Sequence, residues 1–185
     1  MTTAASIPGY VAGTWDIDPV HSDISITAKH FGVSKVRGHF ADYSGEIVTG
    51  EAPLDSKVTA TIQATSIDTK NGDRDNHIRS ADFLDVENYP TITFTSTGIE
   101  GDGEDFTLNG DLTLHGTTKP ISLALELSGF GPDPYGGQRV GFSAKTKLSR
   151  KDFGIAFNAV LETGSLVVSD NLDVSLEIEA VLRAS

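Results

Sequence analysis

The chain has 185 residues, of which 38% are hydrophobic, and it contains no cysteine. This length suits one domain, and the lack of cysteine excludes disulfides, thiolate metal sites and cysteine nucleophiles. The formal net charge of -12 argues against nucleic-acid binding, because phosphate backbones repel an acidic chain.

The first 13 residues, MTTAASIPGYVAG, are expected to form a flexible N-terminal segment of a single domain that spans residues 1–185. They lack the basic region and the continuous apolar stretch of a secretory signal, so the sequence as given predicts a cytoplasmic protein. No apolar run approaches the roughly 18 residues that a membrane-spanning helix needs. Stable membrane insertion is therefore not expected.

Alternating apolar and polar residues occupy most of the chain, which indicates β-strands with one apolar face. The alternation predicts eight or nine strands, mostly in antiparallel hairpins. Long strands favour a closed barrel over a sandwich, because the ten residues from Phe106 to His115 would extend ~33 Å. The clearest apolar stripes are Ile24–Ala28, Val58–Ala64, Phe106–Leu114, Ile121–Leu127, Val140–Leu148 and Leu172–Leu182.

Three glycine-containing segments define how these strands connect. Asn109-Gly110 usually marks a hairpin turn, but the even parity of the apolar residues continues through it. We therefore expect one long strand in which Gly110 permits a bend or a close approach. The turn is expected at Gly116 to Pro120, and the acidic segment Gly101 to Asp105 is expected to be a hairpin turn.

One helical insertion is predicted around residues 73–86, where the alternation stops. Asp73 or Ser80 could cap it, and the proline after Tyr89 ends any helix there. On such a helix Asp73 and His77 share a face and could bind a metal ion. No second ligand pair accompanies them, so a helix surface with ordinary Asp–His contacts is preferred and no metal residue is assigned.

Basic residues gather in two stretches, 24–41 and 134–151. These contain eight of the 14 basic residues and no acidic residue, so the rest of the chain carries a charge of -20. The stretches are either ordinary solvated strand faces or a positive mouth suited to a phosphate or pyrophosphate group.

Three separated blocks resemble the YceI-like family: HFGVSKVRGHFADYSGEI at His30–Ile47, IDTKNGDRDNHIRSADFLDVENYPTITF at Ile67–Phe94, and LNGDLTLHGTTKPISL at Leu108–Leu123. The resemblance extends from about Thr14 to Arg183. It implies a lipocalin-like barrel that holds a long isoprenoid or another amphiphilic lipid. Many members are exported, and in this respect the N-terminus departs from them.

Residues for such a site are chosen from the inward stripes and from the basic segments. The apolar chain is expected to contact Trp15, Ile24, Ile26, Phe40, Ile62, Phe83, Phe94 and Phe142. A charged head group is expected among His30, Lys35, Arg37, Arg74 and Arg79. The alternatives are structural: the aromatic residues as packed core, His30 as a hydrogen-bonded interior histidine, and an arginine that pins the helical insertion by pairing with Asp73, Asp75 or Asp82.

The resulting hypothesis is a non-catalytic protein that transports or stores an amphiphilic lipid in an apolar barrel. Its partner would be a hydrophobic small molecule. We assign no catalytic residue and expect no cofactor other than the bound lipid. The alternatives are a metal-assisted hydrolase or isomerase at the barrel mouth, and a stress-related protein-interaction module with a solid interior. Relatives are often dimeric, so a homodimer is left open.

Overall fold

A computed structural model describes residues 2–158 and 168–184, and these form eleven strand segments, one α-helix and four 3-10 helices. The strands are β1 Gly13–Ile17, β2 Asp23–His30, β3 Ser34–Phe40, β4 Tyr43–Thr49, β5 Lys57–Gln63, β6 Ile67–Asp68, β7 Thr91–Asp102, β8 Asp105–Leu114, β9 Thr117–Pro132, β10 Gln138–Ser149 and β11 Asn171–Leu182. The helices are η1 Ala4–Ser6, η2 Pro53–Asp55, η3 Ala64–Ser66, α1 Gly72–Arg79 and η4 Arg150–Phe153.

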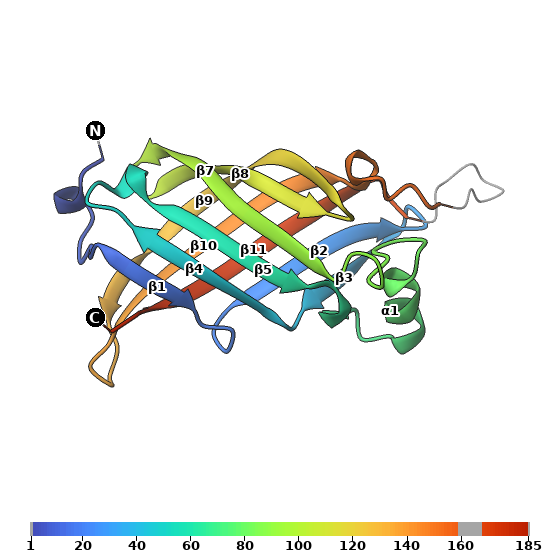
Figure 1. The fold of residues 1–185 in the computed structure, drawn as a ribbon, viewed down its shortest axis with the longest axis horizontal. Helices are drawn as coiled ribbons and strands as arrows, with labels where there is room; N and C mark the ends of the chain where they lie inside the picture. Colours follow the sequence, from blue (N-terminus) through green and yellow to red (C-terminus); the bar gives the residue numbers. More distant parts are fainter. Residues whose placement is uncertain (1, 159–167, 185) are drawn as a thin grey trace.

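The strands close into one antiparallel barrel (Figure 1). β11 pairs with β1 near one end and with β2 near the other, so β1 and β2 are two halves of one broken barrel strand. Next to them, β4 pairs with β1 and β3 pairs with β2, so β4 and β3 are the two halves of the neighbouring barrel strand. In the same way β5 pairs with β4 and β6 pairs with β3, so β5 and β6 are the two halves of the next one. With β7 to β11 the barrel has eight strands among the described residues, which confirms the predicted fold class.

Strand parity is as predicted, with one error in a turn. Inward residues are even-numbered in β8 and odd-numbered in β9, as with buried Leu108 and Leu123. The connection between these strands consists of His115 and Gly116 alone, both at positive φ, and β9 begins at Thr117. The predicted turn from Gly116 to Pro120 is therefore wrong, because Pro120 lies within β9 opposite Asp111.

Gly110 lies in the middle of β8 and has the role that parity predicts. A Cβ atom there would overlap the Phe94 ring, which occupies the space that a side chain would need. The continuous strand through Asn109-Gly110 is confirmed. The acidic segment from Gly101 to Asp105 is likewise the hairpin between β7 and β8.

The helical insertion is confirmed, but it is shorter than predicted. α1 ends at Arg79, and the rest of the 73–86 range forms turns. Its N-cap is Asn71, whose side chain accepts a hydrogen bond from the Arg74 N–H, instead of Asp73 or Ser80. Ser80 is the C-cap.

The two ends of the barrel differ. We call the end with α1 and the β2–β3, β8–β9 and β10–β11 connections the helix end, and the opposite end the N-terminal end (Figure 1). At the N-terminal end Thr2 and Ile7 are buried, and Thr2 Oγ1 donates to Asp102. These contacts pack residues 2–10 against the barrel, and the flexibility expected for this segment stays a prediction. No helix in the described ranges is long and apolar enough to cross a membrane.

Candidate functional site

An apolar cavity of about 210 Å³ opens at the helix end of the barrel; we call it the helix-end cavity. Its walls come from the inward faces of β2, β3 and β11, from the α1 region and from residues around η4. The apolar lining consists of Ile26, Ala28, Val36, Ile78, Phe83, Leu84, Ile155, Phe157, Val168 and Leu172. This surface can take up a hydrocarbon chain, because it offers almost only carbon atoms.

The polar residues of the same lining are all basic or histidine. They are Lys29, His30, Arg74, His77 and Arg150, and no acidic residue is among the described lining residues. An apolar cavity with a basic rim suits an amphiphile whose head group is anionic or a hydrogen-bond acceptor. The two basic stretches of the sequence meet here, since Lys29 comes from the first and Arg150 from the second.

Arg150 lines the helix-end cavity, although it was not among the residues expected there. Its side chain is almost fully buried, and it donates to the carbonyls of Ile155, Phe157 and Ser169 at 2.7–3.0 Å. Its Nη2 lies 3.5 Å from Asp170. Burial lowers the pKa of the Arg150 guanidinium, and the nearby Asp170 carboxylate, which acts in the opposite direction, offsets only part of this shift. Arg150 thus holds the chain on both sides of the β10–β11 connection against the cavity. Parity could have found it, because it continues the even, inward stripe of β10.

Two arginines of the insertion attach α1 to the barrel. Arg79 donates to the carbonyls of Thr65 and Ile67, and Arg74 donates to the carbonyl and hydroxyl oxygens of Thr69. The expected pinning role is therefore present, but main-chain and hydroxyl oxygens replace the predicted aspartates. Asp75 is buried and accepts hydrogen bonds from Thr69.

The expected head-group residues separate into two sets. His30 and Arg74 line the cavity, and Arg74 keeps its Nη1 without a partner in the described part of the chain. Lys35 and Arg37 lie on the outer face of β3, and Arg37 covers Ser25 with a 3.1 Å hydrogen bond. The His30 ring lies against Phe31, 3.8 Å between centroids, and its side chain has no hydrogen bond to another described residue.

The expected chain-contacting residues also divide between places. Ile26 and Phe83 line the helix-end cavity. Ile24, Phe40, Ile62 and Phe94 belong to the packed core cluster beside it or pack against that cluster. Trp15 is fully buried near the N-terminal end, where its indole N–H donates to Thr49.

A second, smaller cavity of about 90 Å³ lies at the N-terminal end; we call it the N-terminal cavity. Phe142 and Val58 line it from the barrel wall, and Ile7 and Tyr10 line it from the N-terminal segment. The two cavities share no lining residue in the described part of the chain. Core side chains fill the space between them, and Phe142 packs against this central cluster. The interior is therefore partly packed, with an apolar cavity at each end.

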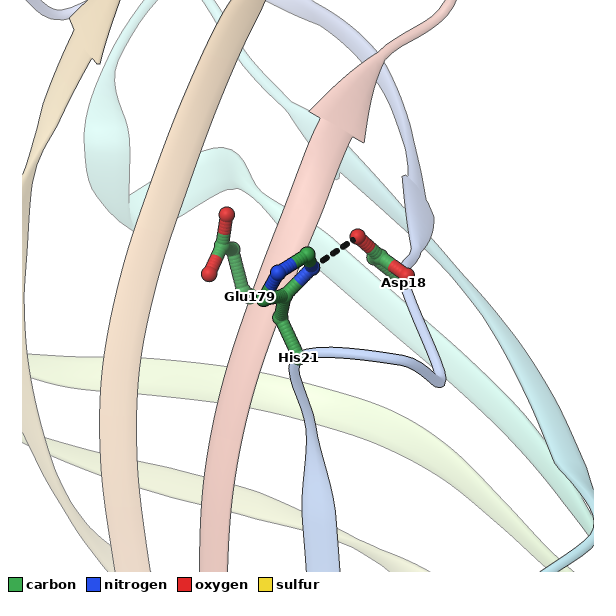
Figure 2. A group of neighbouring side chains, drawn as sticks. All are labelled: Asp18, His21 and Glu179. Atoms are coloured by element: carbon green, nitrogen blue, oxygen red, sulfur yellow. Dashed lines mark hydrogen bonds and ion pairs between the residues drawn. The ribbon is translucent and has the colours of Figure 1, made fainter. Parts of the chain in front are cut away.

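One group of possible metal ligands lies on the outer wall, at Asp18, His21 and Glu179 (Figure 2). His21 Nδ1 lies 2.8 Å from Asp18, while Arg139 Nη1 lies 2.9 Å from Asp18 and 2.8 Å from Glu179. The guanidinium already bridges the carboxylates where a cation would bind, so we interpret the group as an ion-pair network. His77, the predicted partner of Asp73, instead contacts Asp82 at 2.9 Å.

Comparison with known proteins gives a consistent result. The YceI-like domain matches residues 15–180. Protein YceI of Escherichia coli O17:K52:H18 is 41% identical over 174 residues, which cover 92% of this chain and 88% of that protein. A UPF0312 protein of Enterobacter sp. strain 638 is 39% identical and covers 95% of this chain and 90% of its own length.

Solved structures share the fold. The Campylobacter jejuni YCEI protein has a TM-score of 0.73 at 35% identity, covering 84% of this chain and 90% of that chain. A polyisoprenoid binding domain from Saccharophagus degradans has a TM-score of 0.71 at 16% identity, covering 94% of this chain and all of that chain. At that identity the second similarity shows the fold alone. The sequence matches place the chain in a family: it belongs to the YceI-like domain family.

Proposed function

We propose that this protein binds a long-chain isoprenoid or another amphiphilic lipid, with the hydrocarbon chain in the helix-end cavity. The observation that carries the proposal is the lining of that cavity, in which the described residues are ten apolar side chains together with basic residues and histidine. The polyisoprenoid binding domain with the same fold supports the choice of ligand class by analogy.

The apolar walls account for affinity without tight polar recognition. Each buried CH₂ group contributes ~0.8 kcal/mol, so ten of them give roughly 8 kcal/mol before the cost of association. The head group would lie at the rim, near His30 and the Nη1 of Arg74. We exclude Lys35, Arg37 and Arg79 from this role, because the first two lie on the outer face and Arg79 is bonded to carbonyls.

The size of the cavity limits how the ligand enters. About 210 Å³ is below the roughly 300 Å³ at which small-molecule sites begin, so a long chain needs additional space. We propose that the chain extends toward the N-terminal cavity as central side chains, Phe142 in particular, change rotamer. Chain length would then be limited by the distance between the two ends.

A binding function is preferred to catalysis at this mouth. His77 and Asp82 are both about half exposed, and the His77 ring packs against Phe83 and Phe157. Exposed His–Asp pairs of this kind are common on protein surfaces. A transport or storage role, without catalysis and without a further cofactor, is therefore part of the proposal, and a homodimer stays a prediction.

The proposal is tested by organic extraction of the purified protein and mass spectrometry, followed by titration with a pyrene-labelled fatty acid. Ala28→Phe fills the helix-end cavity and should weaken binding at least about tenfold, with stability changed by about 1 kcal/mol or less. Ala124→Phe makes the same change on the exposed outer face of β9 and should leave binding unaltered. If no lipid is extracted and the two variants bind the probe equally, the interior is not a lipid site.

A further inference from the structure

The turn between β2 and β3 exposes apolar side chains at the rim of the helix-end cavity. Val33 is 86% exposed and Phe31 is 43% exposed, and the neighbouring His30 lines the cavity. Phe157, which is 38% exposed, adds apolar surface on another part of the same rim. Exposed apolar side chains grouped at a cavity mouth indicate a surface that is covered during function.

The backbone of this turn is also unfavourable for its sequence. Phe31 has φ 55°, in the left-handed region, where a bulky side chain is rare and costs on the order of 1 kcal/mol or more. Glycine or asparagine would adopt this conformation more readily. The aromatic ring is therefore present despite the backbone preference.

The charges beside the turn are unfavourable as well. Lys29 and Lys35 are directly opposite each other in the β2–β3 register, and like charges in that arrangement destabilise a sheet. The nearby acidic residues already have partners, since Asp170 pairs with Lys151 and Asp173 with Lys147. Within the described ranges no carboxylate pairs with Lys29 or Lys35.

We propose that the tip of the β2–β3 hairpin, residues 29–35, docks on an anionic lipid bilayer and brings the mouth of the helix-end cavity to its surface. Phe31 and Val33 would enter the interfacial region, and Lys29 and Lys35 would contact lipid phosphates. The exposed apolar side chains and the two opposed lysines would both gain favourable contacts there, with the interface and with lipid phosphates respectively. The inference rests on the proposed function, because a ligand collected from a bilayer enters through the rim that faces it.

The acidic body of the protein does not prevent this contact. At physiological ionic strength the screening length is ~8 Å, so the bilayer interacts with the charges of the tip and hardly with the net charge of -12. The positive tip therefore determines which end of the protein approaches the membrane. Docking is peripheral and reversible, since only two apolar side chains of the hairpin enter.

The test is flotation of the full-length protein with phosphatidylglycerol–phosphatidylcholine vesicles and with pure phosphatidylcholine vesicles. Val33→Asp should lower binding to the anionic vesicles about tenfold, because a valine is no longer buried in the interface. Val20→Asp is the matched control, since Val20 is 82% exposed in the connection between β1 and β2, away from the cavity. Lys29→Gln with Lys35→Gln should lower binding about fivefold for each lysine.

The outcomes are separable. The proposal is overturned if Val33→Asp and Val20→Asp bind vesicles equally, or if pure phosphatidylcholine vesicles bind as strongly as anionic ones. It is also overturned if Val33→Asp abolishes a dimer in sedimentation experiments while the unaltered protein ignores vesicles. Titration with the pyrene-labelled fatty acid in vesicle-free solution separates the two proposals: Val33→Asp should bind this probe normally, whereas failure of the unaltered protein to bind it refutes the lipid site itself.

Phe31→Asn tests whether the aromatic ring serves docking or folding. Asparagine tolerates the left-handed backbone, so relief of strain offsets the lost contact with His30. We expect the midpoint of chemical unfolding to stay nearly constant while vesicle binding falls several-fold. A large loss of stability with unchanged vesicle binding would assign Phe31 a structural role.

Discussion

The two ends of the barrel differ in whether particular cationic side chains have a carboxylate partner. Toward the N-terminal end Arg139 contacts three carboxylates, and Arg183 pairs with both Asp16 and Glu46. At the helix end Lys29 and Lys35 face each other without a described carboxylate partner. Lys147, Arg150 and Lys151, also at the helix end, are paired with Asp170 or Asp173. The tip of the β2–β3 hairpin therefore differs from its surroundings, because it leaves two opposed lysines without a carboxylate partner among the described residues.

The two ends also differ in how their cavities are covered. Residues 2–10 cover the N-terminal cavity with Ile7 and Tyr10, and the Tyr10 hydroxyl donates to the carbonyl of Gly50. The helix-end cavity is bordered by half-exposed or basic residues and by a chain segment that Arg150 holds. The N-terminal segment therefore forms a packed plug over the N-terminal cavity, whereas the helix-end cavity has a rim of residues around its opening.

The largest expected effect comes from Arg150→Met at the helix end. Removing the guanidinium leaves one buried and two partly buried carbonyls without a donor, so the free energy of unfolding should fall by about 3 kcal/mol or more. Lys151→Met is the control, because Lys151 is about half exposed and pairs with the same Asp170. In denaturant titration the free energy of unfolding of the control should fall by less than about 1 kcal/mol. Equal losses in the two variants would mean that Arg150 does not hold this rim.

At the opposite end, Ile7→Ala should lower the free energy of unfolding by about 2 kcal/mol, because a buried side chain of the plug is lost. Affinity for the pyrene-labelled fatty acid should stay unchanged if the helix-end cavity is the binding site. A marked loss of affinity would show that the N-terminal end takes part in binding, and the distinction between plug and rim would fail.

The smallest effect concerns the ion-pair network of the outer wall. Hydrogen bonds from His21, Arg139 and the Val20 N–H lower the pKa of Asp18 to about 2, from an ordinary value of 3.8. A carboxyl group with a lowered pKa in the folded state stabilises the protein above about pH 4, and this contribution disappears as the pH falls through about 2. With solvent screening it should amount to about 1 kcal/mol. The melting temperature should fall less between pH 5 and pH 2 in Asp18→Asn than in the unaltered protein, as measured by thermal unfolding.

Much of the barrel wall could be predicted from the sequence, because a strand repeats every two residues and the pattern is local. The parity through Gly110, the reversed parity of β9 and the helical excursion before Pro90 all follow from neighbouring residues. The turn at His115-Gly116 was misplaced because Pro120 is usually a turn residue, whereas here it takes its place within β9 opposite Asp111.

The ends of the barrel were decided by tertiary structure alone. Whether Arg79 binds carbonyls and whether side chains separate two cavities depend on residues far apart in the chain. Arg139 shows the reason: its partner Asp18 is 121 residues away in the chain and becomes a neighbour only when the barrel closes. The sequence by itself determined which residues face inward, since that depends on a local period. Only the closed barrel decided what those residues meet, since that depends on contacts between strands distant in sequence.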